Sequence, residues 1–145
     1  MERSSVAMDL FKKGYNCAQS ILFAFREESG LPEETALKIT CGLGAGMGRK
    51  GEVCGAVTGG ILVLGLRHGK VENGDLPAKE ITYSKTLEFM RRFEAKHGSC
   101  ICRELLDGCD LTTDEGQHFF KENNYLAKIC NRCVRSVVEI LEQIK

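Results

Sequence analysis

Apolar residues recur every three or four positions along most of this chain, and capping residues or glycines separate one such stretch from the next. This spacing places apolar side chains on one face of an α-helix. The sequence therefore predicts an all-α bundle of about seven helices in a single domain, residues 1–145. The helical stretches it predicts are 4–13, 17–29, 32–41, 52–66, 78–96, 102–107, 113–122 and 125–144.

The length and charge of the chain limit its partners. With 145 residues it can bury a core without disulfide staples. Its 20 Lys and Arg balance 20 Asp and Glu, and no basic stripe predicts nucleic-acid binding. The longest apolar run, Ala56 to Leu66, is shorter than the roughly 17–25 residues of a membrane span. Met1-Glu-Arg-Ser-Ser lacks the layout of a signal peptide, so we expect a cytoplasmic protein that binds no membrane.

A glycine-rich segment precedes the most apolar stretch. Gly42 to Gly48 carries a glycine at every second position, which predicts a loop. The run from Glu52 to Leu66 is long for a strand and predicts a buried central helix. On that helix Gly51, Gly55 and Gly59 would stack in one column. The column predicts either tight helix–helix packing or room beside Cys54 for a cluster, a metal or a partner thiol.

The same glycines do not form a nucleotide site. Gly42-x-Gly44 and Gly44-x-Gly46 both lack the third glycine of the dinucleotide fingerprint, and no βαβ pattern surrounds them. Gly51 is followed by Glu52 rather than by the lysine of a phosphate-binding P-loop. We therefore expect no nucleotide cofactor.

Eight cysteines are the most unusual part of the composition. In a reducing compartment, clustered cysteines indicate metal binding or redox chemistry. A helix start presents free N–H groups and a partial positive charge, which favour the thiolate that binds metals and attacks disulfides. Four cysteines fall at or near predicted helix starts: Cys17, Cys54, Cys102 and Cys130. The other four have no such frame, and their roles stay open: Cys41, Cys100, Cys109 and Cys133.

Two close pairs offer an alternative ligand set. The pairs Cys100-x-Cys102 and Cys130-Asn-Arg-Cys133 together could supply four zinc ligands. A single residue separates the first two cysteines, whereas about two to four residues usually separate paired zinc ligands. The second pair would be a redox motif in an α/β thioredoxin context, which this chain lacks. The three histidines stand at no ligand spacing, and we expect them to be solvated or to cap helix ends.

Four segments together resemble the redox-active protein family named after its motif, C-GCAxxG-C-C. They are Tyr15-Asn-Cys17-Ala-Gln, Gly42-Leu-Gly-Ala-Gly-Met-Gly-Arg49 with Cys54-Gly-Ala-Val-Thr-Gly59, Cys102-Arg-Glu-Leu-Leu, and Cys130 with Val134 and Glu139-Ile-Leu141. The resemblance covers nearly the whole chain and implies a redox role carried by four cysteines. Here Gly55 follows Cys54, whereas the motif's name places glycine first. Similar domains accompany haem in split-Soret cytochromes, but no C-x-x-C-H is present, so covalent haem is not expected.

Three functions follow for these cysteines. The first is an electron-transfer module in which Cys17, Cys54, Cys102 and Cys130 ligate an iron–sulfur cluster, most simply [2Fe–2S]. The second is a thiol–disulfide oxidoreductase in which Cys54 attacks and Cys17, Cys102 or Cys130 resolves. The third is a zinc-stabilised helical interaction protein. A redox role needs a partner protein, and a homodimer stays open. The redox hypotheses lose their physical basis if the four sulfurs scatter in the fold.

Overall fold

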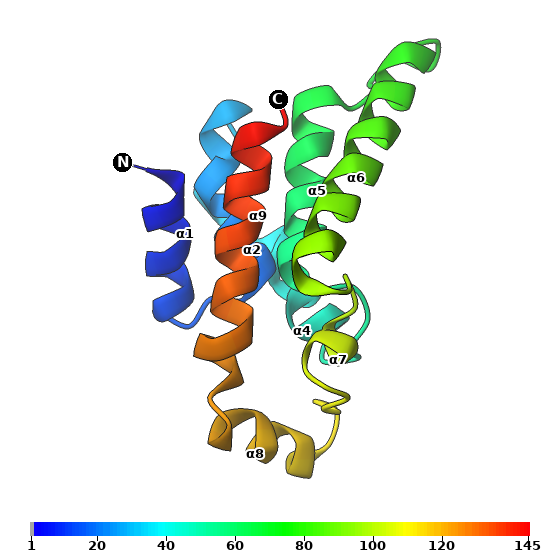
Figure 1. Cartoon of the computed structure of the whole chain (residues 1–145). Helices are drawn as coiled ribbons and strands as arrows, with labels where there is room; N and C mark the ends of the chain where they lie inside the picture. Colours follow the sequence, from blue (N-terminus) through cyan, green and yellow to red (C-terminus); the bar gives the residue numbers. More distant parts are fainter. Residues whose placement is uncertain (1) are drawn as a thin grey trace.

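The computed structural model describes residues 2–145, and the predicted all-α bundle is confirmed (Figure 1). Two 3₁₀ turns and a π-helical segment, Leu126–Cys130, join the helices. Between residues 2 and 145 no β-strand forms, and the one isolated bridge pairs Val53 with Ile101. The helices are α1 (Arg3–Lys12), α2 (Cys17–Phe25), α3 (Glu33–Thr40), α4 (Gly44–Met47), α5 (Gly55–His68), α6 (Leu76–His97), α7 (Cys102–Leu105), α8 (Asp114–Glu122) and α9 (Asn131–Gln143).

The core forms around α2 and α5, which pack directly against each other. Helix α1 lies beside α2 and α9, α6 lies beside α5, and α9 contacts α2, α5 and α6 (Figure 1). The predicted central helix is therefore buried as expected, with most of its residues withdrawn from solvent. The largest fully buried side chains come from α2, α5, α6 and α9 and from the residue after α7: Ile21, Leu22, Phe25, Val57, Val63, Leu64, Phe89, Phe93, Leu106, Val134, Val137 and Leu141.

The glycines of α5 explain the close approach of its neighbours. A Cβ atom at Gly59 would lie 3.1 Å from the Cα of Ala18 on α2. A Cβ atom at Gly60 would overlap the ring of Phe89 on α6, with Cε2 at 2.9 Å. Of the two alternatives for the glycine column, Gly59 therefore supports tight helix packing. Gly51 was wrongly placed in the column, because it precedes α5 and has φ +77°.

Several helix boundaries differ from the sequence prediction. Helix α5 begins three residues later than Glu52, because residues 51–54 form backbone hydrogen bonds to residues 100–103 instead of to their own helix. Helix α6 begins earlier than Ala78, at Leu76, where the Asp75 side chain accepts a hydrogen bond from the Ala78 amide. The predicted last helix is divided, since its first part adopts the π-helical form.

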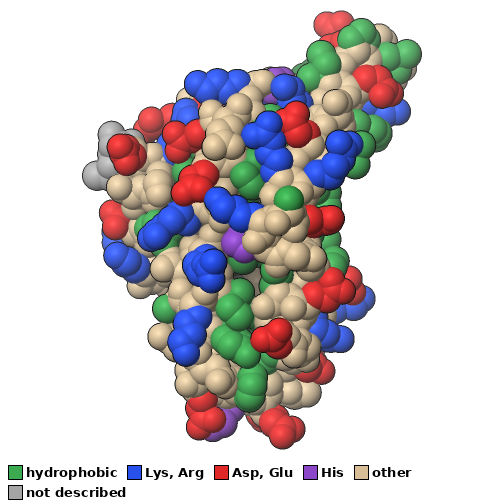
Figure 2. Space-filling view, in the orientation of Figure 1, with side chains coloured by type: hydrophobic (Ala, Val, Ile, Leu, Met, Phe, Trp, Pro, Cys, Tyr) green, Lys and Arg blue, Asp and Glu red, His purple; other side chains and the backbone are tan. Residues whose placement is uncertain are grey.

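The surface carries both signs of charge without segregation. Over the face shown in Figure 2, Lys and Arg side chains lie among Asp and Glu side chains, as the balanced composition predicts. Within residues 2–145, none of the helices combines the length and apolarity needed to cross a bilayer.

Arg67 ties the end of α5 to two other elements. Its Nε and Nη2 donate to the carboxylate of Glu28 at 2.7 and 2.9 Å, and its Nη1 donates to the carbonyl oxygens of Leu141 and Ile144 at 2.8 Å each. Arg3 reaches the same carboxylate at 2.7 Å. These charge-assisted bonds satisfy carbonyls at the end of α9 that have no partner within the helix.

The Glu28 contacts predict a pH-dependent contribution to stability. The hydrogen bond from Arg67, with the charges of Arg67 and Arg3, lowers the pKa of Glu28. A lowered pKa stabilises the folded state above the unfolded glutamate value of about 4.3, and this gain is lost as the pH falls through the folded-state value. We expect Glu28→Gln to reduce the free energy of unfolding by about 1 kcal/mol at neutral pH and by almost nothing below both pKa values.

Urea unfolding of the two chains across this pH range measures the effect. Glu139→Gln is the matched control, because it removes the exposed Lys96–Glu139 pair and should change stability little at either pH. Identical pH profiles for the two variants would contradict the role given to Glu28.

Candidate functional site

One pocket of about 300 Å³ gathers the four cysteines found near helix starts: Cys17, Cys54, Cys102 and Cys130. It lies at the end of the bundle where α1 finishes and α2 and α5 begin, toward α7 and α8 at the bottom of Figure 1. The four residues come from distant parts of the chain. The fold therefore brings these four residues to one pocket.

Asn16 fixes the position of Cys17. The Asn16 side chain accepts a hydrogen bond from the Gln19 amide at 2.9 Å, and Gln19 returns one to the Asn16 amide at 3.0 Å. This capping box starts α2 at Cys17. Asn16 Nδ2 also donates to the carbonyl of Cys41 at 2.9 Å, which ties the helix start to the glycine-rich segment. At Gly55 a Cβ atom would lie 3.3 Å from that of Cys17, so this glycine admits Cys17 to the site.

Backbone pairing holds Cys54 and Cys102 side by side. The Cys54 amide donates to the carbonyl of Cys100 at 2.7 Å, and the Cys102 amide donates to the carbonyl of Glu52 at 2.6 Å. These bonds flank the Val53–Ile101 bridge. Cys54 becomes the N-cap of α5 rather than a residue of its first turn, and Cys102 is the first residue of α7. A shift of either segment would therefore move both thiols.

The glycine-rich segment makes a left-handed turn beside the pocket. Five successive residues, Ala45 to Arg49, have φ between 55° and 75°. Left-handed backbone costs an L-residue roughly 1–2 kcal/mol, so the glycines at positions 46 and 48 avoid this cost at two of the five residues. Gly46 also lies against Cys102, because a Cβ atom there would be 2.7 Å from the Cys102 Cβ and 2.7 Å from the Glu52 amide nitrogen. The sequence predicted a loop here, whereas the structure forms a 3₁₀ turn and the short helix α4, with left-handed backbone at Ala45 and Gly46. The segment lines one wall of the pocket.

Cys130 reaches the pocket from the end of the π-helical segment, directly before α9. A π-helical turn is wider than an α-helical one and occurs mostly as a short insertion at functional sites. Here it changes the phase of the helix just where Cys130 packs against a small buried cluster of Cys102, Leu106, Cys109 and Leu111.

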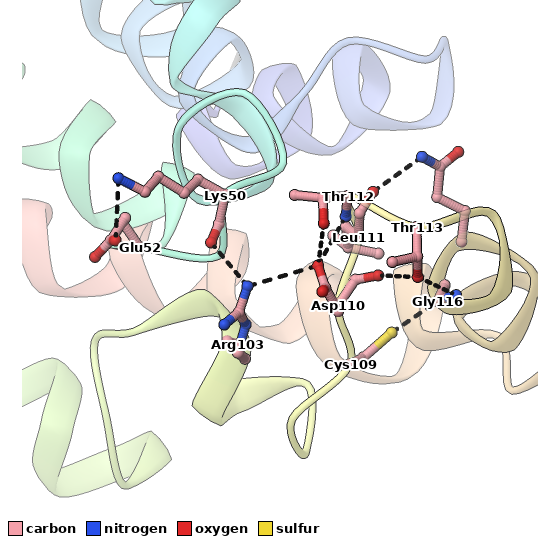
Figure 3. Close-up of polar contacts among 10 residues, drawn as sticks. Lys50, Glu52, Arg103, Cys109, Asp110, Leu111, Thr112, Thr113 and Gly116 are labelled. Atoms are coloured by element: carbon pink, nitrogen blue, oxygen red, sulfur yellow. Dashed lines mark hydrogen bonds and ion pairs between the residues drawn. The ribbon is translucent and has the colours of Figure 1, made fainter.

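Polar contacts fasten α7 to its surroundings (Figure 3). Arg103, the residue after Cys102, donates to the carbonyl of Lys50 at 3.3 Å and lies 3.5 Å from the carboxylate of Asp110. Thr112 donates its amide to the same carboxylate at 3.0 Å. Figure 3 shows these contacts as one chain from the segment before Cys54 to the turn before α8. They hold the Cys102 backbone from both sides.

The thiols are close enough to oppose each other's ionisation. A hydrogen bond with Cys130, then burial and the neighbouring sulfurs, raises the pKa of Cys17 well above its ordinary value. Burial, then the charges of Cys54 and Cys130, raises the pKa of Cys102 to about 12. Four thiolates in this space would repel one another strongly unless a cation stood between them.

Cys54 differs from the other pocket cysteines. A hydrogen bond from the Cys133 thiol lowers the pKa of Cys54, and the backbone amides of Ala56 and Val57 at the start of α5 act in the same direction, against burial. Cys54 is therefore the pocket thiol best stabilised as a thiolate by its own surroundings.

The walls of the pocket are mostly apolar, with two cations among the lining residues. Aromatic and aliphatic side chains such as Phe11, Phe120 and Leu126 limit the access of water. Arg49 and Lys121 also line the pocket and bring positive charge to it. This environment favours a negatively charged group held by thiolates.

The remaining cysteines have separate places. Cys133 is buried, and the neighbouring Cys54 raises its pKa; the sequence did not predict this proximity, and its one signal was the three-residue spacing from Cys130. Cys100 and Cys109 are buried, and their thiols donate to backbone carbonyls of Met90 and Gly116. Cys41 is exposed.

The thiols do not form a preformed mononuclear metal site. Across residues 2–145, no three His, Cys, Asp or Glu side chains are grouped so that they could hold one ion as they stand. Cys100, a member of the alternative zinc set, does not line the pocket. His118 is exposed as expected, but His97 is half-buried and bonds to Ser136 at 2.8 Å because α6 packs there on α9.

A family model described as "Putative redox-active protein (C_GCAxxG_C_C)" matches residues 15–144, most of the chain. The chain belongs to this family. The four pocket cysteines all lie within the matched range, and the redox role expected from the sequence agrees with the family's description. The comparisons with curated proteins and with solved structures found no match to the chain. The family therefore gives the class of chemistry, and the site must supply the mechanism.

Proposed function

We propose that this member of the family is an electron-transfer protein in which Cys17, Cys54, Cys102 and Cys130 ligate a [2Fe–2S] cluster. The observation that carries the proposal is that these four thiols line one pocket. Cysteine thiolates are the usual ligands of such clusters.

The arrangement of the thiols favours two iron atoms over one zinc ion. A zinc ion needs all four ligands around a single centre, whereas a [2Fe–2S] cluster needs two at each iron. Cys130 is the neighbour that contributes most to the raised pKa of Cys17, and Cys54 and Cys102 are joined through their backbone segments. This two-and-two arrangement supports the binuclear cluster, although the side chains must rotate from their thiol–thiol contacts to bind it.

The chain's own residues would prepare and insulate the centre. Loading releases the thiol protons and replaces the repulsion among the sulfurs by attraction to iron. The apolar walls exclude water, and Arg49 and Lys121 offset negative charge. When bound, the cluster supplies a carrier of one electron at a time. The fixed backbone around Cys54 and Cys102 keeps the ligand positions unchanged during transfer.

Anaerobic purification and reconstitution test the proposal. We expect two irons and two sulfides per chain, with the visible absorption of a [2Fe–2S] cluster. Cys102→Ser should lose this absorption, and Cys41→Ser, a change at an exposed cysteine outside the pocket, should keep it. A colourless, iron-free protein after reconstitution would reject the cluster. Stoichiometric zinc, with loss of fold on chelation, would instead support the zinc-stabilised interaction protein.

Thiol–disulfide exchange is the second candidate function. The lowered pKa of Cys54, beside neighbours whose pKa values are raised, supports Cys54 as the attacking thiolate. In the iron-free protein, Cys54 should then react with iodoacetamide faster than the other pocket cysteines near neutral pH. Equal slow alkylation of all eight cysteines would reject this function.

A further inference from the structure

Helix α6 is longer than α5 and α9, the two helices on which it packs. It has 22 residues, whereas α5 has 14 and α9 has 13. Figure 1 shows the start of α6 projecting beyond the ends of both neighbours. The buried residues of α6 are Phe89 and Phe93, which lie in its second half. Residues 76–87 therefore form an arm in which no side chain is buried.

The arm carries apolar side chains in one exposed line. Leu76, Tyr83 and Leu87 are 60%, 58% and 55% exposed, and Met90 continues the line at the edge of the core. With Glu80 included, these positions are spaced alternately by four and three residues. This is the spacing of a helix that packs lengthwise along a second helix. We call Leu76, Tyr83, Leu87 and Met90 the α6 stripe.

The α6 stripe lacks the cover that stabilises helices elsewhere in the bundle. A helical segment of this length is marginal in water unless an apolar face packs against something. Figure 2 shows hydrophobic side chains along the surface of the projecting arm. An exposed line of large apolar side chains is typical of an interaction surface, and tyrosine is among the residues most enriched at the centre of interfaces.

The charges beside the α6 stripe favour a second copy of the chain as the partner. Glu80 and Arg91 are exposed on the same side of the stripe, three residues before Tyr83 and four residues after Leu87. Within residues 2–145, neither of them forms an ion pair. Two antiparallel copies would place each Glu80 opposite Arg91 of the other copy. A parallel pair would instead oppose like charges.

We propose that the arm is the interface of a homodimer, in which two copies pack antiparallel through the α6 stripe about a two-fold axis near residue 85. The inference goes beyond the proposed electron-transfer function and does not depend on it, because the arm lies at the opposite end of the bundle from the cysteine pocket (Figure 1). A helix rises about 1.5 Å per residue, so about 20 Å of α6 separates this axis from Gly98 in each copy. The dimer therefore keeps the two pockets apart and leaves both open to partner proteins.

Sedimentation velocity of the iron-free chain over a range of concentrations tests the interface. A reductant is present, so that the exposed Cys41 cannot form a disulfide between chains. The unmodified chain should show a monomer–dimer equilibrium. Leu87→Asp should raise the dissociation constant of the dimer by about 100-fold or more, because one substitution acts twice across a two-fold interface.

Ile81→Asp is the matched control for Leu87→Asp. Ile81 is also an exposed apolar residue of the arm, at 48%, but it follows Leu76 by five residues and precedes Tyr83 by two, which places it away from the α6 stripe. This variant should therefore keep the dimer. An unmodified chain that stays monomeric at every concentration, or equal dissociation of the two variants, would overturn the proposal. Urea unfolding of each variant distinguishes loss of the dimer from loss of the fold.

Two charge-reversal variants test the antiparallel direction. Glu80→Lys and Arg91→Glu should each weaken the dimer, because each places like charges opposite one another at both ends of the interface. An equimolar mixture of the two variants should recover the dimer, since every heterodimer then contains two pairs of opposite charge. A mixture that dissociates as readily as its two components would overturn the antiparallel pairing.

Discussion

Gly46→Ala is expected to lower the affinity of the site for the proposed cluster by about 10–100-fold, the size of effect that follows when a residue supporting a metal ligand is disturbed. The new Cβ atom would meet the Cβ of Cys102 and the backbone at Glu52, both at 2.7 Å. The alanine must also keep φ at +66°. Strain and overpacking together should reduce the free energy of unfolding by about 2–5 kcal/mol. Iron analysis after reconstitution and urea unfolding of the reduced iron-free chain measure the two effects.

Gly48→Ala provides the control for Gly46→Ala. Gly48 has nearly the same left-handed conformation, with φ +62°, but no atom lies within 4 Å of a Cβ built there. Gly48→Ala should therefore lose only the backbone-strain contribution to the free energy of unfolding, roughly 1–2 kcal/mol, and should bind as much iron as the unmodified chain. Equal losses of stability and iron in the two variants would mean that close approach to Cys102 is not what requires glycine at position 46.

Phe89→Ala is expected to reduce the free energy of unfolding by about 3–5 kcal/mol, because it empties a fully buried aromatic site between α5 and α6. Gly60→Ala should also destabilise the chain, by about 1–3 kcal/mol, since its new methyl group enters the space of the Phe89 ring. The methyl group that Gly60→Ala introduces and the ring of Phe89 would occupy the same space. Gly60→Ala should therefore destabilise a Phe89→Leu chain less than it destabilises the unmodified chain. A double-mutant cycle by urea unfolding measures this coupling, which should be about 0.5–3 kcal/mol.

Gly65→Ala separates packing from helix propensity in the same helix. A Cβ atom at Gly65 meets nothing within 4 Å, so alanine there should stabilise α5 by about 0.5–1 kcal/mol. Gly60→Ala should lower the free energy of unfolding and Gly65→Ala should raise it, because only the methyl group at position 60 meets the Phe89 ring. Additive effects of Gly60→Ala and Phe89→Leu would contradict the shared volume.

The sequence was sufficient to predict the helices because their signals are local. Asn16 lies one residue before the first apolar residues of α2 and caps it, and Gly98 ends α6 in a left-handed conformation. The start of α5 could not be predicted in the same way. Cys54 is drawn out of the helix by hydrogen bonds to a segment almost fifty residues later, and no pattern near Cys54 reports that pairing.

The four pocket cysteines were predictable because helix starts and the family motif select the same positions. Cys133 was not, although it follows Cys130 by three residues and so lies near it on the helix surface. Its contact depends on how α9 packs against α5, which is a property of the assembled core. The left-handed turn was predicted only as a loop, since glycines permit several backbone conformations and the Cys102 contact selects one.

The backbone pairing between residues 51–54 and 100–103 also makes α5 and α6 a hairpin that is closed at its base. The pairing at this base positions the thiols of Cys54 and Cys102, whereas the connection between α5 and α6, residues 69–75, lies at the opposite end of the hairpin. Doubling the length of a flexible connection costs only about 0.6 kcal/mol of closure entropy. Gly74, where a Cβ atom would meet nothing within 4 Å, lies in this connection and marks a place where a reporter domain can be inserted. An inserted fluorescent or affinity module at the tip would leave Cys54 and Cys102 in register, so the redox centre can be studied in a tagged chain.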